Sequence, residues 1–304
     1  MERYVSLRVP ATSANCGPGF DSLGLAVNLY NEVTYELTDS GFQLEVEGEG
    51  KDFLKPHGRN LAFQSFLHLW NKATDFRRTG LKVRMINRIP MARGLGSSSA
   101  AIVGGLAAAN ILSGANFSRE VLLQLATEIE GHPDNVAPAI YGGFTVSFTD
   151  GESGAHTLPV LPAKPLQFVA VVPEMRLATS VARQAIPAVV PHHDAVFNAS
   201  RTGLLVGSLL SGNYTFLGEA MEDKLHQPYR AHLIPHLRDV FEAAKQAGAY
   251  NAIISGAGST IMAYVAAEKN AVAVAGAMCE VLRSYDQCCS YHILQLDTDG
   301  VKVI

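Results

Sequence analysis

Residues 90–100 have the sequence Pro90-Met91-Ala92-Arg93-Gly94-Leu95-Gly96-Ser97-Ser98-Ser99-Ala100. An apolar run that predicts a strand (residues 81–86) precedes them, and a run of small residues that predicts a helix (residues 100–112) follows. Glycine adopts backbone conformations that other residues rarely adopt, and its lack of a side chain lets a bulky anion approach the main chain. The first turn of a helix adds amide groups without partners and the positive end of the helix dipole. The stretch therefore predicts a phosphate-binding loop.

Two well-known phosphate motifs do not match this stretch. No Lys-Ser or Lys-Thr follows the last glycine, as a Walker A loop requires, and the glycine spacing is not GxGxxG. Taken alone, the glycines and serines are as consistent with a plain turn and helix cap as with a phosphate site. Other parts of the chain have to decide between these two interpretations.

Length and charge limit the classes of function. The chain has 304 residues, 48% hydrophobic and 17% charged, which is typical of a globular protein of about two domains. Its net charge of -4 gives no general attraction to nucleic acid or to an anionic membrane. A polar, glycine-rich segment at residues 149–154, followed by three prolines, places a domain boundary near residues 150–165. We assign residues 1–158 and 159–304 to two domains.

Sequence features that set the cellular compartment point to the cytoplasm. The first 17 residues have no basic region followed by an apolar one, and the longest apolar run (residues 100–112) is too short to span a bilayer. The four cysteines, Cys16, Cys279, Cys288 and Cys289, form neither a disulfide framework nor a CxxC metal motif. We therefore expect a reducing compartment and no membrane partner.

The first half of the chain offers two further candidate regions. A strand ending at Val9 runs into a loop rich in glycine and proline, where Asn15 and Asp21 are either turn formers or ligands to a small molecule. Residues 60–70 predict a helix whose aromatic stripe indicates a core rather than a cofactor site. Asn60 is expected to cap this helix, with a nucleotide contact as the alternative.

The densest polar cluster follows a second amphipathic helix, predicted over residues 118–130. It contains Glu128, Glu130, His132, Asp134 and Asn135. A solvated helix end would explain it, and so would Mg²⁺, which prefers one or two carboxylates together with water and substrate phosphates. Zinc is less consistent with the cluster, because no HExxH or paired histidine spacing occurs there.

The second half predicts an alternation of strands and helices. Without the extra helices, the order is β-α-β-β-α-β, as in ferredoxin-like domains. The two middle strands, residues 252–255 and 260–265, are joined by the glycine-rich turn at residues 256–259. That turn is either a plain hairpin or a second backbone site for a ligand.

Three stretches together resemble the GHMP kinase superfamily. They are PATSANCGPGFDSLGLA (10–26), PMARGLGSSSAAIVGG (90–105) and NAIISGAGSTIMA (251–263). They occur in the family's order along the whole chain, which favours the phosphate-loop interpretation. The resemblance implies an α+β two-domain fold, with an N-terminal domain like ribosomal protein S5 domain 2 and a ferredoxin-like C-terminal domain.

More specific stretches resemble the branch of this superfamily that phosphorylates L-homoserine. They are residues 13–21, His132–Ala139 ahead of Tyr141-Gly142-Gly143, Thr179–Arg183 and Gln227–Arg230. Cys16 and Ser259 depart from the family pattern, which bears on loop stiffness more than on activity. The resemblance implies transfer of phosphate from ATP, with Mg²⁺, to the homoserine hydroxyl in threonine biosynthesis. We expect a cytoplasmic homodimer that binds no nucleic acid.

The resemblance also implies roles for individual residues. Residues 90–100 would wrap the ATP phosphates, and Asn60 would lie in the nucleotide pocket. Ser97 and Glu128 would hold the metal, with Ser98 as the alternative serine and Glu130 as the alternative carboxylate. The remaining matches are Asn15, Asp21, His132, Arg183 and Arg230 for homoserine, and Thr179 and Asn135 near the attacking hydroxyl. Two rival functions stay open: a kinase for a sugar or an isoprenoid alcohol, and a nucleotide-binding sensor without catalysis.

Overall fold

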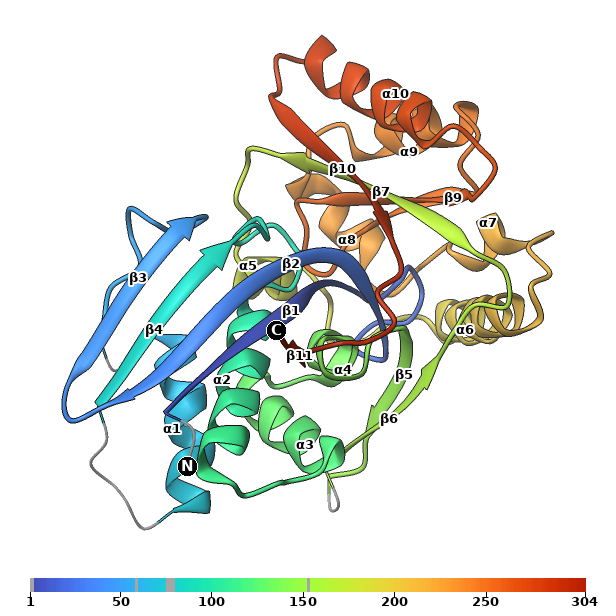
Figure 1. The fold of residues 1–304 in the computed structure, drawn as a ribbon. Helices are drawn as coiled ribbons and strands as arrows, with labels where there is room; N and C mark the ends of the chain where they lie inside the picture. Colours follow the sequence, from blue (N-terminus) through green and yellow to red (C-terminus); the bar gives the residue numbers. More distant parts are fainter. Residues whose placement is uncertain (1–2, 58–59, 75–79, 152–153) are drawn as a thin grey trace.

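The structure is a computed structural model that describes residues 3–57, 60–74, 80–151 and 154–304. Its strands form two sheets, seen at the left and at the top of Figure 1. The first sheet contains β1 (Tyr4–Ala14), β2 (Leu23–Thr38), β3 (Phe42–Gly48), β4 (Gly80–Asn87), β5 (Phe144–Thr149), β6 (Ala155–Val160) and β11 (Lys302–Val303). The second contains β7 (Leu166–Pro173), β8 (Asn251–Ile254), β9 (Ile261–Ala266) and β10 (Cys289–Gln295).

The first sheet has the order β11-β1-β2-β4-β3, and β5 continues it by pairing with β2 and β6. All its pairs are antiparallel except β3 with β4, which are parallel and joined through a helix. Four helices lie together on one side of this sheet in Figure 1. They are α1 (Leu61–Ala73), α2 (Ser97–Ser113), α3 (Arg119–Glu130) and α4 (Pro133–Tyr141).

Helix α2 is almost entirely buried, because nearly all its inward residues are alanine, glycine or medium-sized aliphatics. A Cβ atom at Gly105 would lie 2.8 Å from the Ala62 carbonyl oxygen, so the glycine allows α1 and α2 to pack closely. On α1, Phe66 stacks between Tyr35 and Trp70 in the core. The expectations of a buried small-residue helix and of an aromatic core stripe are both confirmed.

The second sheet has the order β10-β7-β9-β8. Helices α9 (Leu237–Gln246) and α10 (Ala271–Ser284) pack against each other, and α9, α10 and the sheet contribute to a second hydrophobic core. Between β7 and β8 the chain forms α5 (Thr179–Gln184), α6 (His192–Ser211), α7 (Leu217–Ala220), α8 (Gln227–Arg230) and the short 3-10 helix η1 (Ala231–Leu233).

Within residues 215–224, only Leu217–Ala220 is helical. The physical reason lies in Asp223. Its carboxylate accepts hydrogen bonds from the amides of Leu225, His226 and Gln227 at 2.6–3.0 Å, which favours a capped turn over a continued helix.

The two halves of the chain are interleaved at their ends. Strand β6 crosses the boundary placed between residues 158 and 159, and that boundary stays a prediction. Residues near the C-terminal end return to the first sheet, where Lys302 and Val303 pair with Arg8 and Leu7 of β1.

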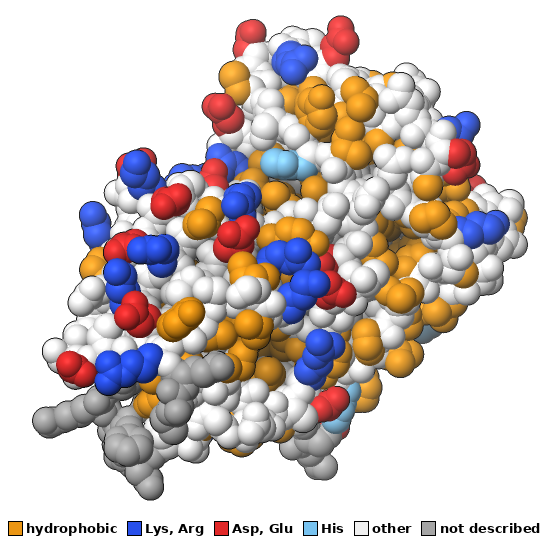
Figure 2. All heavy atoms as spheres, in the orientation of Figure 1, with side chains coloured by type: hydrophobic (Ala, Val, Ile, Leu, Met, Phe, Trp, Pro, Cys, Tyr) orange, Lys and Arg blue, Asp and Glu red, His pale blue; other side chains and the backbone are white. Residues whose placement is uncertain are grey.

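The surface in view in Figure 2 carries charges of both signs over the region of β2 to β4. There Glu45 pairs with Lys82 and Arg84, and Arg88 pairs with Glu32. Within the described residues, none of the helices is both long and apolar enough to cross a membrane.

Candidate active site

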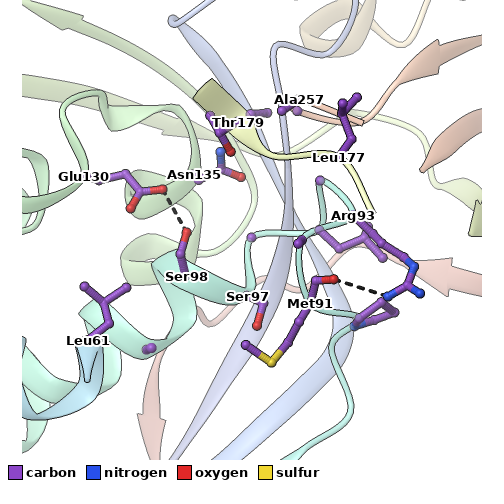
Figure 3. Close-up of a pocket in the computed structure, with 18 of the residues that line it drawn as sticks. Leu61, Met91, Arg93, Ser97, Ser98, Glu130, Asn135, Leu177, Thr179 and Ala257 are labelled. Carbon is purple, nitrogen blue, oxygen red and sulfur yellow. Dashed lines mark hydrogen bonds between the residues drawn. The ribbon is translucent and has the colours of Figure 1, made fainter. Parts of the chain in front are cut away.

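A pocket of about 500 Å³ brings the three glycine-rich stretches together. Both halves of the chain line it (Figure 3). The first half contributes residues 90–98, Asn15, Asp21 and the polar cluster after α3, and the second contributes Thr179, Arg183, Arg230 and Gly256. Distant parts of the sequence therefore converge on one cavity.

The loop at residues 92–95 is anchored by its carbonyl groups. Four consecutive carbonyl oxygens accept hydrogen bonds from outside the loop, namely Ala92 from the Leu177 amide (3.1 Å), Arg93 from the Thr260 amide (3.0 Å), Gly94 from Ser255 Oγ (2.6 Å) and Leu95 from the Thr12 amide (3.1 Å). In a trans peptide the N–H points away from the C=O. The amides that follow these carbonyls therefore point to the opposite side, and α2 adds its N-terminal amides beyond Gly96.

Gly94 and Gly96 both have positive φ, +79° and +70°. A Cβ atom at Gly94 would overlap the Ser255 carbonyl oxygen, and one at Gly96 would overlap Thr12 Oγ1. These glycines are thus required by packing within the protein as well as by backbone conformation. The unusual backbone conformation and the approach of a ligand were expected from the sequence, whereas this packing was not.

Arg93 does not present a free guanidinium to the pocket. Its Nε donates to Pro173 O (3.0 Å), NH1 to Met91 O (3.2 Å) and NH2 to Glu174 O (2.9 Å). Figure 3 shows the bond to Met91. The side chain joins the loop to the end of β7, and because Arg93 also lines the pocket, its contact with ATP stays a prediction.

The two candidate carboxylates of α3 lie in different surroundings. Glu130 Oε1 accepts hydrogen bonds from Ser98 Oγ and Ser99 Oγ, each at 3.1 Å, and Figure 3 shows it directed at Ser98. Burial raises the pKa of the Glu130 carboxyl. The charge of His132 and the serine hydrogen bonds lower this pKa, but their effect is smaller than that of burial. Glu130 lines the pocket beside the phosphate loop.

Glu128, by contrast, faces α1. Its Oε2 lies 3.2 Å from His68 Nε2 and 3.3 Å from Lys72 Nζ, and its side chain is half exposed. It is not among the residues that line the pocket. Of the two carboxylates that the sequence left open for the metal, only Glu130 thus lines the pocket. Ser97 lines the pocket but points away from Glu130 in Figure 3.

A cluster of charged side chains of both signs also lines the pocket. Arg183 holds Asp21 through two bonds, 2.7 and 3.1 Å. His132 Nδ1 lies 2.6 Å from Asp134 Oδ1. Burial alone would lower the pKa of His132, but the hydrogen bond and charge of Asp134 outweigh it and raise the pKa. Carboxylate and imidazole atoms of Asp21, His132 and Asp134 lie within 4.8 Å of one another.

Arg230 is a buried cation, only 2% exposed, that lines the same pocket. Burial lowers its pKa to about 10, and the charge of Arg183 acts in the same direction. Both guanidinium groups lie over the ring of Phe20, at 5.3 and 5.4 Å from its centroid. Phe20, to which the sequence had given no role, thus lies close to both arginines.

The amide side chains predicted for the site also hold the fold together. Asn15 Nδ2 donates to Gly256 O (3.0 Å) and its Oδ1 accepts from the Asp21 amide (3.1 Å), so it joins the first and third glycine-rich stretches. Asn60 caps α1 by accepting from the Ala62 amide, which confirms the cap, and it also lines the pocket.

Asn135 and Thr179 come together from separate elements. Asn135 Oδ1 accepts from Thr12 Oγ1 at 2.8 Å, and Thr179 is the first residue of α5. Figure 3 shows the two side chains facing each other beside Ala257.

Comparison with known proteins places this geometry in a family. The family model of the GHMP kinases N terminal domain matches residues 60–143, and that of the GHMP kinases C terminal matches residues 205–284. The fold is therefore the α+β two-domain fold of GHMP kinases, with an S5-like first domain and a ferredoxin-like second domain.

Full-length relatives narrow the family further. The homoserine kinase of Desulfitobacterium hafniense is 43% identical over 99% of this chain and 100% of its own length. That of Caldanaerobacter subterraneus is 45% identical over 88% of this chain and 85% of its own. The crystal structure of homoserine kinase from Cytophaga hutchinsonii has a TM-score of 0.89 and 30% identity, covering 100% of this chain and 98% of that one. The chain accordingly belongs to the homoserine kinase family of the GHMP kinases.

Proposed function

We propose that this protein transfers the γ-phosphoryl group of ATP to the side-chain hydroxyl of L-homoserine, as a step of threonine biosynthesis. One observation carries the proposal. The backbone loop at residues 92–98 and the charged cluster of Asp21, Arg183 and Arg230 open into the same pocket. A phosphate donor and a zwitterionic acceptor would therefore meet there.

Mg²⁺ fits the donor set beside the loop. Glu130, Ser98 and Ser99 offer only oxygen atoms, which Mg²⁺ prefers, and the buried carboxylate with its raised pKa would gain from a cation. We assign the metal to Glu130 and Ser98 in place of Glu128 and Ser97. When bound, the ion would neutralise charge on the β- and γ-phosphates.

The ammonium and carboxylate groups of the substrate have complementary partners in the charged cluster of the pocket. Asp21, with Asp134 behind His132, would bind the ammonium group, and Arg183 and Arg230 would bind the carboxylate. Guanidinium groups suit this because they bind carboxylates through two parallel hydrogen bonds. Binding would exchange the Asp21–Arg183 pair for two pairs with the substrate.

The transfer step needs position more than covalent help. Thr179 and Asn135 would orient the hydroxyl for attack in line with the leaving group. The loop amides and the N-terminus of α2 would stabilise the charge on the transferred group. Phosphoryl transfer through a loose transition state asks for little beyond this, so no general base is assigned.

ADP release, measured across a panel of acceptors, tests the function. We expect turnover with L-homoserine and little with L-serine, L-threonine, mevalonate or galactose. Turnover with mevalonate or galactose would support the rival kinase function. ATP binding without turnover on any acceptor would support the nucleotide sensor. A Glu130→Gln variant serves as the inactive control.

Two further properties are proposed. All four cysteines are free, two of them buried, which is consistent with a reducing cytoplasm. We propose a homodimer, to be tested by light scattering on the purified protein.

A further inference from the structure

His226 is a buried histidine to which the chemistry above gives no role. Its side chain is 0% exposed, and its ring stacks on Phe20 with centroids 5.3 Å apart. Its Nε2 lies 2.7 Å from the Gly17 carbonyl oxygen, and its Nδ1 lies 3.2 Å from NH1 of Arg230. The ring thus lies between the first substrate loop and the buried arginine.

The partners of His226 determine its protonation. A carbonyl oxygen only accepts, so Nε2 carries the hydrogen, and a guanidinium only donates, so Nδ1 is the acceptor. The ring is therefore neutral and in the Nε2–H tautomer. Burial lowers the pKa of His226 and outweighs the nearby Asp223 carboxylate, which is consistent with this state.

The backbone around His226 is held firmly. The Asp223 carboxylate, itself fully buried, accepts from the His226 and Gln227 amides, and Gln227 Oε1 accepts from the Ile254 amide at 2.8 Å. The imidazole is therefore presented by a fixed segment, which makes it a suitable anchor for a neighbouring side chain.

Arg230 uses most of its donors within the protein. Nε donates to Ala182 O at 3.2 Å, and NH1 donates to Gly256 O at 2.9 Å and to His226 Nδ1. NH2 is the remaining nitrogen of a residue that lines the pocket. Without the acceptor on His226, one NH1 hydrogen would lose its partner and the guanidinium plane would be less fixed.

We propose that His226 is a positioning residue, whose Nδ1 orients the Arg230 guanidinium so that NH2 is presented to the substrate carboxylate. This rests on the proposed function. His226 would act through Arg230 on binding of the acceptor and would have no effect on the nucleotide.

Two substitutions separate the hydrogen bonds of the ring. In His226→Asn the amide oxygen lies near the place of Nδ1 and can still accept from Arg230. In His226→Gln the amide reaches toward Gly17 and the Nδ1 acceptor is lost. We expect His226→Gln to raise the KM for homoserine about tenfold, the size of one charge-assisted hydrogen bond, with the KM for ATP within about twofold. His226→Asn should restore most of the loss. His193→Gln, on a side chain 76% exposed, is the control.

A substrate analogue distinguishes positioning from general structural damage. With L-homoserine amide there is no carboxylate for Arg230 to bind, so His226→Gln should leave the KM for the amide nearly unchanged. An equal rise for acid and amide, or a similar rise in the KM for ATP, would overturn the proposal.

The tautomer can be read in the wild type, whether or not the variants fold. Ring ¹⁵N chemical shifts should identify His226 as neutral with the hydrogen on Nε2 at pH 7. An imidazolium or an Nδ1–H tautomer would overturn the proposal. Failure of the proposed function would give a different result, because the wild-type protein would then release no ADP with homoserine.

Discussion

Glu128 and Glu130 are two residues apart on one helix, and this spacing explains why the sequence left them undecided. Residues two apart on an α-helix do not face the same side, because each residue turns by about 100°. Glu128 thus faces Lys72 on α1, whereas Glu130 faces the serines that begin α2. Which side holds the phosphate loop depends on packing between distant segments, and the local sequence does not specify it.

The choice of carboxylate predicts opposite outcomes for two matched variants. Glu130→Gln should lower turnover about 100-fold or more, since removal of one charge-stabilising group typically costs about 2.7–4 kcal/mol of transition-state energy. Glu128→Gln should change turnover less than about threefold, because an exposed ion pair contributes little. Steady-state ADP release with homoserine measures both. Greater damage from Glu128→Gln would return the metal to that residue.

Glu130 should also reduce stability, in a pH-dependent way. Its folded pKa is raised by burial, so the stability it contributes is fully present below the unfolded pKa and is lost as pH rises through the folded pKa. Without metal, Glu130→Gln should therefore unfold at a higher temperature than the wild type at pH 7, and the difference should vanish near pH 4. Thermal unfolding in a chelating buffer tests this. A lower melting temperature for the variant at pH 7 would contradict it.

Arg230 is the residue for which lysine is the most informative replacement. Lysine keeps the charge but lacks the planar fork, and it cannot bond Ala182, Gly256 and the substrate together. Arg230→Lys should raise the KM for homoserine about tenfold or more, while the KM for ATP stays nearly constant. Arg238→Lys, on an exposed part of α9, is the matched control. Equal KM values for homoserine in the two variants would remove Arg230 from carboxylate recognition.

At the scale of elements, α2 is flanked by a glycine at each end, and the two glycines can be compared because their backbone conformations are nearly the same. Gly96 and Gly114 have nearly the same φ, +70° and +71°. At Gly114 a Cβ atom would meet nothing within 4 Å, whereas at Gly96 it would overlap Thr12 Oγ1. The two positions therefore separate backbone strain from steric overlap within one helix.

This difference predicts unequal effects of alanine at the two ends. Gly114→Ala should cost about 1–2 kcal/mol of unfolding free energy, the cost of a left-handed conformation, and leave ATP affinity unchanged. Gly96→Ala should cost clearly more and also weaken ATP binding, because Thr12 or the loop must move. Urea unfolding and ATP titration measure the two quantities. Equal losses of stability would mean that the loop yields without strain.

Elements with strong local signals were predictable, and those set by tertiary contacts were not. The burial of the aromatic face of α1 and of the small residues of α2 can be predicted from the sequence alone. Helix α7 is short because the Asp223 carboxylate accepts hydrogen bonds from three backbone amides that follow it. The spacing of apolar residues in the sequence does not reveal these bonds. In the site, the glycines and serines favoured a phosphate loop only together with the other stretches that resemble the family. The anchoring of Arg93 by carbonyls of β7 and beyond required the fold.

At the scale of the whole molecule, Asp297 joins the late part of the chain to the first sheet. Its Oδ2 accepts from Tyr30 OH (2.8 Å), its carbonyl accepts from the Gly143 amide (2.6 Å), and its amide donates to Ala26 O (3.0 Å). The side chain is buried, and its Oδ1 also accepts from the Gly300 amide. The first sheet is thus completed by residues far from it in sequence.

Asp297→Ala should therefore destabilise the protein although it lies outside the pocket. The buried Gly300 amide would lose its partner, which costs about 1–3 kcal/mol, and the partly buried Tyr30 hydroxyl would lose a hydrogen bond as well. We expect a clear fall in melting temperature with KM values unchanged at a temperature where the variant is folded. Asp39→Ala, at an exposed bend, is the control. An unchanged melting temperature would show that the closure contributes little.

The return of the chain to β1 also has a consequence for synthesis on the ribosome. Strands β1 to β6 emerge first, but the partners that Asp297 supplies to Tyr30, Ala26 and Gly143 do not yet exist. At ordinary elongation rates the interval from Val160 to Asp297 lasts on the order of ten seconds. During that time the outer edge of β1 is open to pairing with another chain, which is a known route to aggregation. We therefore expect the first domain to be most prone to aggregation in the interval before the last residues of the chain have been made.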